Sequence, residues 1–286
     1  MAYIVETSWL ADRLGLNGGS AEKTFIADCR FLLSDPESGK RAYLEGHLPG
    51  AVYIDLEKHL SGPVTQHGGR HPLPEPEVLA QRLGLLGIDR ETPVVAYDDQ
   101  GGMFASRLWW VLHYLGHEQV YVLNGGFADW AVQGLPVEQG ERTTAPTELV
   151  AFEAKPLTEL LVSREEVKAR LHDPSVFLID SREPKRYRGE EEPIDKAAGH
   201  VPGAANYFWK DVLAADGRWK NADGLKEQFS GVPADKEIIV YCGSGVSACP
   251  NVLSLNEAGF AGVRLYAGSW SDWISYEDGE IAVGGE

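Results

Sequence analysis

Residues 46–51 read GHLPGA and residues 199–204 read GHVPGA, so one block of sequence occurs twice in this chain of 286 residues. Further blocks recur in the same order: DCR (28–30) as DSR (180–182), VVAYD (94–98) as IIVYC (238–242), and LNGGFADW (123–130) as YAGSWSDW (266–273). Self-similarity at a long and nearly constant period indicates a duplicated structural unit. We therefore interpret the chain as a duplication with one domain in each copy.

The apolar runs in both copies are short and rich in branched residues, which is typical of buried strands. They are FIADC (25–29), VVAYD (94–98) and VYVLN (120–124), then VFLID (176–180), EIIVYC (237–242) and VRLYA (263–267). Helix-like segments lie between them, such as 103–117 and 163–172, and the second begins with a Ser163/Glu166 capping box. Alternating strands and helices predict an α/β fold, with a parallel sheet in each copy and helices on both faces.

The length of the chain suits two domains of ordinary size. Around residues 143–158 the sequence contains prolines and adjacent threonines without a clear period, which is typical of a linker. We predict an N-terminal domain over residues 1–142, a linker over 143–158 and a C-terminal domain over 159–286.

The formal net charge of −17 argues against nucleic acids or anionic membranes as partners, since both require a basic surface. The sequence has no run of 18 apolar residues and does not begin like a signal peptide, so we expect a soluble, unexported protein. Its cysteines are Cys29, Cys242 and Cys249, too few for a disulfide framework, which favours a reducing compartment and predicts a cytoplasmic location.

Cys242 ends a strand-like run and opens the loop CGSGVSA (242–248), which leads into a helix-like segment at 249–257. In a strand, tight loop and helix of this kind, successive backbone N–H groups can point at one atom, with the helix dipole behind them. A cysteine at the mouth of such a loop is expected to ionise to a thiolate near neutral pH and to act as a nucleophile.

The loop CGSGVSA resembles the active-site loop of the tandem rhodanese and mercaptopyruvate sulfurtransferases. Other blocks of that family are resembled by the segments DSREPKRYRG (180–189), GHVPGAAN (199–206) and AGSWSDW (267–273). The resemblance implies a catalytic C-terminal domain that needs no cofactor and transfers sulfur in a ping-pong reaction. A small anionic donor gives its sulfane sulfur to Cys242 as a persulfide, and a thiophilic acceptor such as cyanide or a thiol removes it.

The resemblance also assigns roles to individual positions. It places the active-site loop at Gly243, Ser244, Gly245, Val246, Ser247 and Ala248. In the first copy, the position of the cysteine is occupied by Asp98, whose carboxylate cannot accept a sulfane sulfur, so we expect that domain to be catalytically inactive. Arg186 occupies the place of a substrate-binding arginine, a side chain suited to grip a carboxylate or sulfonate-like group, although a solvated surface charge is the alternative.

Asp55 and His71 match positions at which related enzymes place a polar group across the domain interface. Together with Ser244 they could relay a proton, although a structural role for His71 stays open. Asp180 and Arg182 are duplicated, as Asp28 and Arg30, so we expect hydrogen-bonded pairs that hold loops, with tuning of the site as an alternative.

Other conspicuous residues have simpler interpretations. We expect a structural role for the duplicated His47 and His200, and core packing for Cys29 and Cys249. Tyr207 and Trp209 either line the substrate pocket or belong to the core. A metal site is not expected, because the sequence has no C-x-x-C motif or close Cys/His pair.

Two rival functions are considered. A dual-specificity phosphatase requires C-x5-R, whereas position 248 is alanine, and a non-enzymatic sulfur carrier or interaction module would show no turnover with small donors. Among donors, the CGSGV loop resembles that of mercaptopyruvate enzymes. Those enzymes carry a second arginine in an E-P-R segment, where this chain has Glu192-Pro193-Ile194. We therefore predict thiosulfate as the donor and keep 3-mercaptopyruvate as the alternative.

Overall fold

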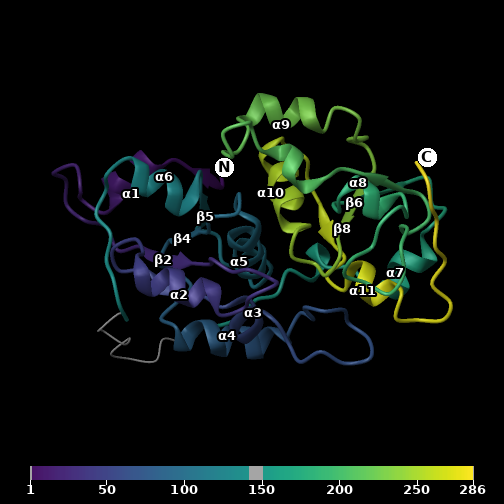
Figure 1. Ribbon diagram of the computed structural model, residues 1–286, viewed down its shortest axis with the longest axis horizontal. Coiled ribbons are helices and arrows are strands. Elements are labelled where there is room, and N and C mark those ends of the chain that lie inside the picture. The colour runs from purple at the N-terminus through teal and green to yellow at the C-terminus, as the bar shows by residue number, and fades with distance from the viewer. Residues whose placement is uncertain (1, 142–150, 286) are drawn as a thin grey trace. The chain divides into compact units, whose positions relative to one another are not determined.

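The computed structural model describes residues 2–141 and 151–285, and the chain divides into two compact units (Figure 1). The first unit contains Met1–Leu60, Pro74–Leu157 and Ala215–Trp219, and the second contains Ser61–Leu73, Thr158–Ala214 and Lys220–Glu286. Two short segments, 61–73 and 215–219, thus belong to the unit formed by the opposite half of the chain. This exchange is absent from the predicted domains 1–142 and 159–286, and residues 143–150 of the predicted linker lie outside the described residues.

The first unit is built around a parallel five-stranded sheet of order β1-β5-β4-β2-β3. Its strands are β1 (Ile4–Val5), β2 (Phe25–Asp28), β3 (Val52–Tyr53), β4 (Val94–Tyr97) and β5 (Val120–Leu123). The strands β2 and β4 are buried along their whole length, as their continuous apolar sequences predict for a sheet covered on both faces.

The second unit contains a parallel four-stranded sheet of order β7-β6-β8-β9. Its strands are β6 (Val176–Asp180), β7 (Ala204–Asn206), β8 (Glu237–Tyr241) and β9 (Arg264–Leu265). This order repeats β3-β2-β4-β5 of the first unit, so the predicted duplication and the predicted parallel sheets are confirmed. The sequence did not reveal β1, β3 and β7, strands of two or three residues. The strand β9 is equally short, but it lies within the predicted run 263–267.

Helices cover both faces of the first sheet. They are α1 (Thr7–Arg13), α2 (Ser38–Glu45), α3 (Leu56–Leu60), α4 (Pro76–Leu85), α5 (Met103–Tyr114) and α6 (Gly126–Val132). Leu10, Tyr43 and Trp130, from α1, α2 and α6, share one buried cluster with Val95 and Leu123 of the sheet. On the opposite face α5 packs on β4 and β5, while α3 contacts α5 and α4 contacts α3.

The second sheet is covered in the same way. Its helices are α7 (Arg164–Ala169), α8 (Pro184–Tyr187), α9 (Ala222–Gln228), α10 (Cys249–Glu257) and α11 (Ser269–Trp273), with 3-10 turns at Thr158–Leu160 and Trp209–Val212. Val167, Tyr187 and Trp270, from α7, α8 and α11, pack on Ile239 and Tyr241 of β8. In Figure 1 these three helices lie on one side of β8, and α10 lies on the other beside α9. The predicted capping box of Ser163 and Glu166 is confirmed at the start of α7.

The repeated sequence blocks make matching contacts in the two units. Arg30 Nη2 donates to the Asp28 carboxylate and to the Gly46 carbonyl oxygen, each at 2.6 Å. Arg182 Nη2 donates to the Asp180 carboxylate and to a glycine carbonyl oxygen at the same distances. These pairs hold the loop that follows the first long strand of each unit, as predicted.

The two repeated histidines also share one environment. His47 stacks on Tyr43 at a centroid distance of 4.0 Å, and His200 stacks on Tyr187 at 3.8 Å. In each case the Nδ1 atom lies 2.8 Å from the backbone oxygen of that tyrosine, so both rings serve the packing of their units.

Candidate active site

Cys242 directly follows β8 and is held by the start of α11. Its backbone N–H donates to Ser269 Oγ at 3.1 Å, and its carbonyl oxygen accepts from the Trp270 N–H at 2.9 Å. Ser269 Oγ also lies 4.0 Å from Cys242 Sγ and donates to the Tyr266 carbonyl oxygen at 2.9 Å. Ser269 has a left-handed φ of 57°, which is uncommon for a residue other than glycine and often marks a functional position. Sequence reasoning missed Ser269, although its block was recognised as a repeat.

The loop after Cys242 is tight and almost entirely buried. Every residue from 243 to 248 is buried except Ser247, which is half-buried. Gly245 has a φ of +76°, and a Cβ atom there would lie 2.2 Å from the Ala267 carbonyl oxygen, so only glycine fits. Cys249 begins α10 and is buried, with its Sγ 3.3 Å from the Gly245 carbonyl oxygen, an environment that matches the predicted core packing.

The equivalent loop of the first unit shows what such a loop can hold. The Asp98 carboxylate is buried and accepts four backbone N–H bonds at 2.8–3.0 Å, from Gln100, Gly102, Phe104 and Ala105. Burial raises the pKa of Asp98 and outweighs the lowering effect of these hydrogen bonds. In this unit a carboxyl side chain thus fills a cradle of backbone amides. The repeat aligns Asp98 with Cys242, which supports an equivalent anion-holding role for the amides of the second loop.

His71 and Ser244, which sequence reasoning grouped together, contact each other. His71 Nδ1 lies 2.8 Å from Ser244 Oγ, and both side chains are buried. Both belong to the second unit, because His71 lies in the segment 61–73. Asp55 belongs to the first unit, where its carboxylate accepts the N–H groups of Glu57 and Lys58, each at 2.9 Å, at the start of α3. These contacts make Asp55 a helix cap, and its part in a proton relay stays a prediction.

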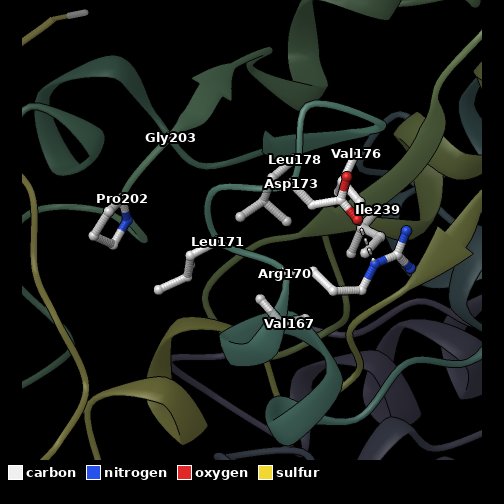
Figure 2. A pocket seen from close by; sticks show the side chains of 9 residues that line it. All are labelled: Val167, Arg170, Leu171, Asp173, Val176, Leu178, Pro202, Gly203 and Ile239. Carbon is white, nitrogen blue, oxygen red and sulfur yellow. Dashed lines mark ion pairs between the residues drawn. The ribbon is translucent and has the colours of Figure 1, made fainter.

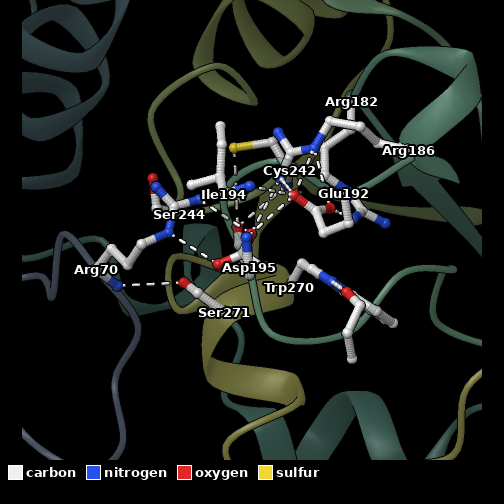
Figure 3. Close-up of polar contacts among 12 residues, drawn as sticks. Arg70, Arg182, Arg186, Glu192, Ile194, Asp195, Cys242, Ser244, Trp270 and Ser271 are labelled. Carbon is white, nitrogen blue, oxygen red and sulfur yellow. Dashed lines mark hydrogen bonds and ion pairs between the residues drawn. The ribbon is translucent and has the colours of Figure 1, made fainter. Parts of the chain in front are cut away.

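Arg186 lies at the end of α8 within a cluster of charges (Figure 3). Its Nη2 atom lies 2.7 Å from Glu192 Oε1 and 3.0 Å from Asp195 Oδ2. Burial raises the pKa of Glu192, but hydrogen bonds from Arg186 and from the backbone outweigh it, so this pKa lies below the usual range. Arg182 Nη1 lies 3.3 Å from Glu192 Oε2, which also accepts from Arg186 Nε at 3.0 Å, so Glu192 links the Asp180–Arg182 pair to Arg186.

A second arginine, which sequence reasoning missed, borders the same loop. Arg70 donates to Asp195 through Nε at 2.9 Å and through Nη2 at 3.1 Å. A Cβ atom placed on Gly243 would lie 2.8 Å from Arg70 Nη2, and 3.6 and 3.7 Å from the two terminal nitrogens of Arg186. Two guanidinium groups thus lie beside the residue that follows Cys242.

A further repeat in the sequence could have revealed Arg70. The tripeptide GRH at 69–71 corresponds to GRW at 217–219, and these are the two exchanged segments. Each segment contacts one of two aspartates that the repeat aligns, Asp272 and Asp129. In the segment 61–73 the Gly68 N–H donates to Asp272 Oδ1 at 2.6 Å, and in the segment 215–219 Arg218 Nη1 donates to Asp129 Oδ1 at 2.7 Å.

The remaining aromatic candidates have the surroundings of core residues. Trp209 is buried, and Tyr207 packs against Phe177 and Phe229, as core aromatics do. Figure 2 shows a pocket of about 30 Å³ on the second unit, room for only a few water molecules. None of its lining residues comes from the loop 242–248; they are Val167, Arg170, Leu171, Asp173, Val176, Leu178, Pro202, Gly203 and Ile239. Within residues 2–141 and 151–285 there is no group of side chains arranged to hold a metal ion.

Comparison with known proteins agrees with this geometry. Residues 7–133 and 163–276 match the family model of the Rhodanese-like domain. The chain belongs to the rhodanese family. It is 44% identical over 289 residues to the "Probable 3-mercaptopyruvate sulfurtransferase" of Pseudomonas aeruginosa, with 99% of each chain covered. It is 33% identical over 282 residues to the thiosulfate sulfurtransferase of Bos taurus, covering 95% of this chain and 91% of that one.

Among solved structures, the chain is similar to SseA from Escherichia coli, described as a 3-mercaptopyruvate sulfotransferase. The TM-score is 0.81 at 33% identity, covering 95% of this chain and all of that one. In the part of the chain that the structure describes, no helix has the length and apolar character needed to cross a bilayer.

Proposed function

We propose that the protein is a sulfurtransferase that moves a sulfane sulfur from a small anionic donor to a thiophilic acceptor through a persulfide on Cys242. The observation that carries the proposal is the position of Cys242 at the end of β8, at the mouth of a buried loop bordered by Arg70 and Arg186. The family and the names of its relatives support it.

Two displacements at sulfur account for the reaction. The Cys242 thiolate attacks the outer sulfur of thiosulfate or the thiol sulfur of 3-mercaptopyruvate. The S–S or C–S bond breaks, and its electron pair leaves with sulfite or with the enolate of pyruvate, which then takes up a proton. The acceptor then attacks the outer sulfur of the persulfide, and the Cys242 thiolate leaves. Amides of the loop, arranged as around Asp98 in the first unit, would stabilise the negative charge on the persulfide.

Two donors are considered on chemical grounds. Sulfite leaves thiosulfate as a stable anion, whereas the enolate that leaves 3-mercaptopyruvate must gain a proton to become pyruvate. The hydrogen-bonded pair of His71 and Ser244 can supply that proton, which favours 3-mercaptopyruvate as the donor. The name of the Pseudomonas aeruginosa relative also favours this donor. Thiosulfate stays the proposed donor and 3-mercaptopyruvate the second candidate, because the E-P-R arginine is missing at Ile194.

We also propose a cytoplasmic location, on the basis of the three cysteine thiols. Cys29, Cys242 and Cys249 are all free and buried, so a reducing compartment such as the cytoplasm suits the enzyme.

The persulfide is the direct test of the proposed function. Incubation with donor in the absence of acceptor is expected to add one sulfur atom to the peptide that contains Cys242, because no acceptor is present to remove it in the second displacement. Mass spectrometry of digested protein measures the addition, and cyanide should remove it. A sulfur found on Cys249 instead would contradict the assignment of the nucleophile.

His71→Ala is expected to separate the two donors. The variant loses the partner of Ser244 Oγ, so proton delivery to the leaving enolate slows, and kcat with 3-mercaptopyruvate should fall by roughly 10- to 100-fold. With thiosulfate the fall should be smaller, because sulfite needs no proton to leave. Steady-state kinetics with both donors and a fixed cyanide concentration measure the ratio. Equal losses with the two donors would indicate that His71 only positions the loop.

A further inference from the structure

We propose that Arg70 is a second anion-binding residue for the sulfur donor, and that Asp195 is an internal carboxylate that occupies both arginines until a donor replaces it. This inference deepens the proposed function and rests on it.

The contacts of Asp195 are those that a bound donor would make (Figure 3). Its carboxylate meets Arg70 through two parallel hydrogen bonds, at 2.9 and 3.1 Å, and meets Arg186 at 3.0 Å. A planar guanidinium binds any carboxylate or similar oxyanion through the same paired geometry. Asp195 therefore shows that the two arginines can grip one anion between them.

The arginines are placed for an anion that is attached to the reacting sulfur. Both guanidinium groups lie near Gly243, the residue directly after Cys242. A small donor whose outer sulfur meets Cys242 has its charged group only a few bonds away. The segment 61–73 thus supplies a second arginine beside the loop, at a different place in the chain from position 194, which is isoleucine here.

Asp195 can release Arg70 without leaving Arg186 unpaired, because Arg186 keeps both oxygens of Glu192 at 3.0 Å from its Nε atom. The Arg70 side chain is 29% exposed, whereas that of Asp195 is 4% exposed, so Arg70 is the partner that solvent and a donor can reach. With Asp195 in place, the two arginines are neutralised by two carboxylates. A chain with a net charge of −17 then has no net local charge to attract an anion.

Kinetics and equilibrium binding together test the inference. Arg70→Ala should raise KM for thiosulfate and 3-mercaptopyruvate by roughly 5- to 30-fold with little change in kcat, because the contact is made before the chemical step. Asp195→Asn, which keeps the shape but removes the charge, should lower KM by roughly 2- to 10-fold. In the double variant Arg70→Ala/Asp195→Asn most of that gain should be lost, since the two changes act on one pair.

The chain offers a matched control in Arg218→Ala. Arg218 occupies the corresponding place on the other exchanged segment, where it pairs with Asp129 and Glu6. Its removal changes the net charge equally and is expected to leave KM unchanged.

Calorimetric titration with pyruvate and with sulfate, which carry no transferable sulfur, should rank the variants in the same order as KM. If the wild type binds these anions but transfers no sulfur, the proposed function fails, whereas the anion-binding role of Arg70 and the competing role of Asp195 stand. If Arg70→Ala binds them like the wild type, or if Asp195→Asn raises KM as a purely structural carboxylate would, the inference is overturned.

Discussion

Cys242→Ser is expected to reduce sulfur transfer to the background rate with every donor. A serine hydroxyl does not ionise near neutral pH and cannot form a persulfide, so neither displacement can occur. The substitution removes only the sulfur atom, while the backbone bonds from Cys242 to Ser269 and Trp270 remain. Thiocyanate formation from thiosulfate and cyanide measures the loss, and an unchanged thermal unfolding curve shows that the fold is intact.

Cys29→Ser and Cys249→Ser are the matched controls and should keep most of the activity. Burial, together with the nearby charges of Asp98 and Asp28, raises the pKa of Cys29 well above its usual range, so this thiol stays neutral and inert. Cys249 is buried and lies against the Gly245 carbonyl oxygen. Transfer that persists in Cys242→Ser, or that is lost in Cys249→Ser with the fold intact, would show that another thiol carries the sulfur.

Arg186→Ala is expected to lower kcat/KM by roughly 10- to 150-fold with either donor, the equivalent of a charge-assisted pair of about 1.5–3 kcal/mol. Most of the loss should appear as a raised KM, because the guanidinium holds the donor in the ground state as well as in the transition state. Arg186→Lys should recover only part of it, since an ammonium keeps the charge but lacks the planar pair of donors. Initial rates over a range of donor concentrations separate KM from kcat.

A disturbed structure around Glu192 is the alternative explanation for a lower kcat/KM in Arg186→Ala. Among the residues that the structure describes, removal of Arg186 leaves Arg182, at 3.3 Å, as the basic partner of the Glu192 side chain, which is 4% exposed. The double variant Arg186→Ala/Glu192→Gln also removes the charge of Glu192. Its stability to urea should return toward that of the wild type, whereas its KM should stay raised. Arg188→Ala, which removes an exposed arginine paired with Glu190, is the surface control. An unchanged KM in Arg186→Ala would mean that Arg70 or the loop amides hold the donor.

The sequence by itself determined the duplication, the long strands and the position of the cysteine. These features are local: a buried strand such as β8 is a continuous apolar run, and the glycine loop follows it directly in the chain. The capping box at Ser163 was predictable for the same reason, because its two partners lie three residues apart. The aligned Asp98 also identified the loop of the first unit as different in chemistry.

Only the tertiary structure decided which distant side chains meet at this loop. Arg70 is 125 residues from Asp195, and His71 is 173 residues from Ser244. The exchange of segments 61–73 and 215–219 brings such partners together, and it depends on contacts with Asp272 and Asp129 that have no local pattern. Periodicity reports which face of an element is buried, but not which residue from elsewhere in the chain covers it. For that reason the nucleophile could be found in the sequence, whereas the pairing of Arg70 with Asp195 beside this loop could not.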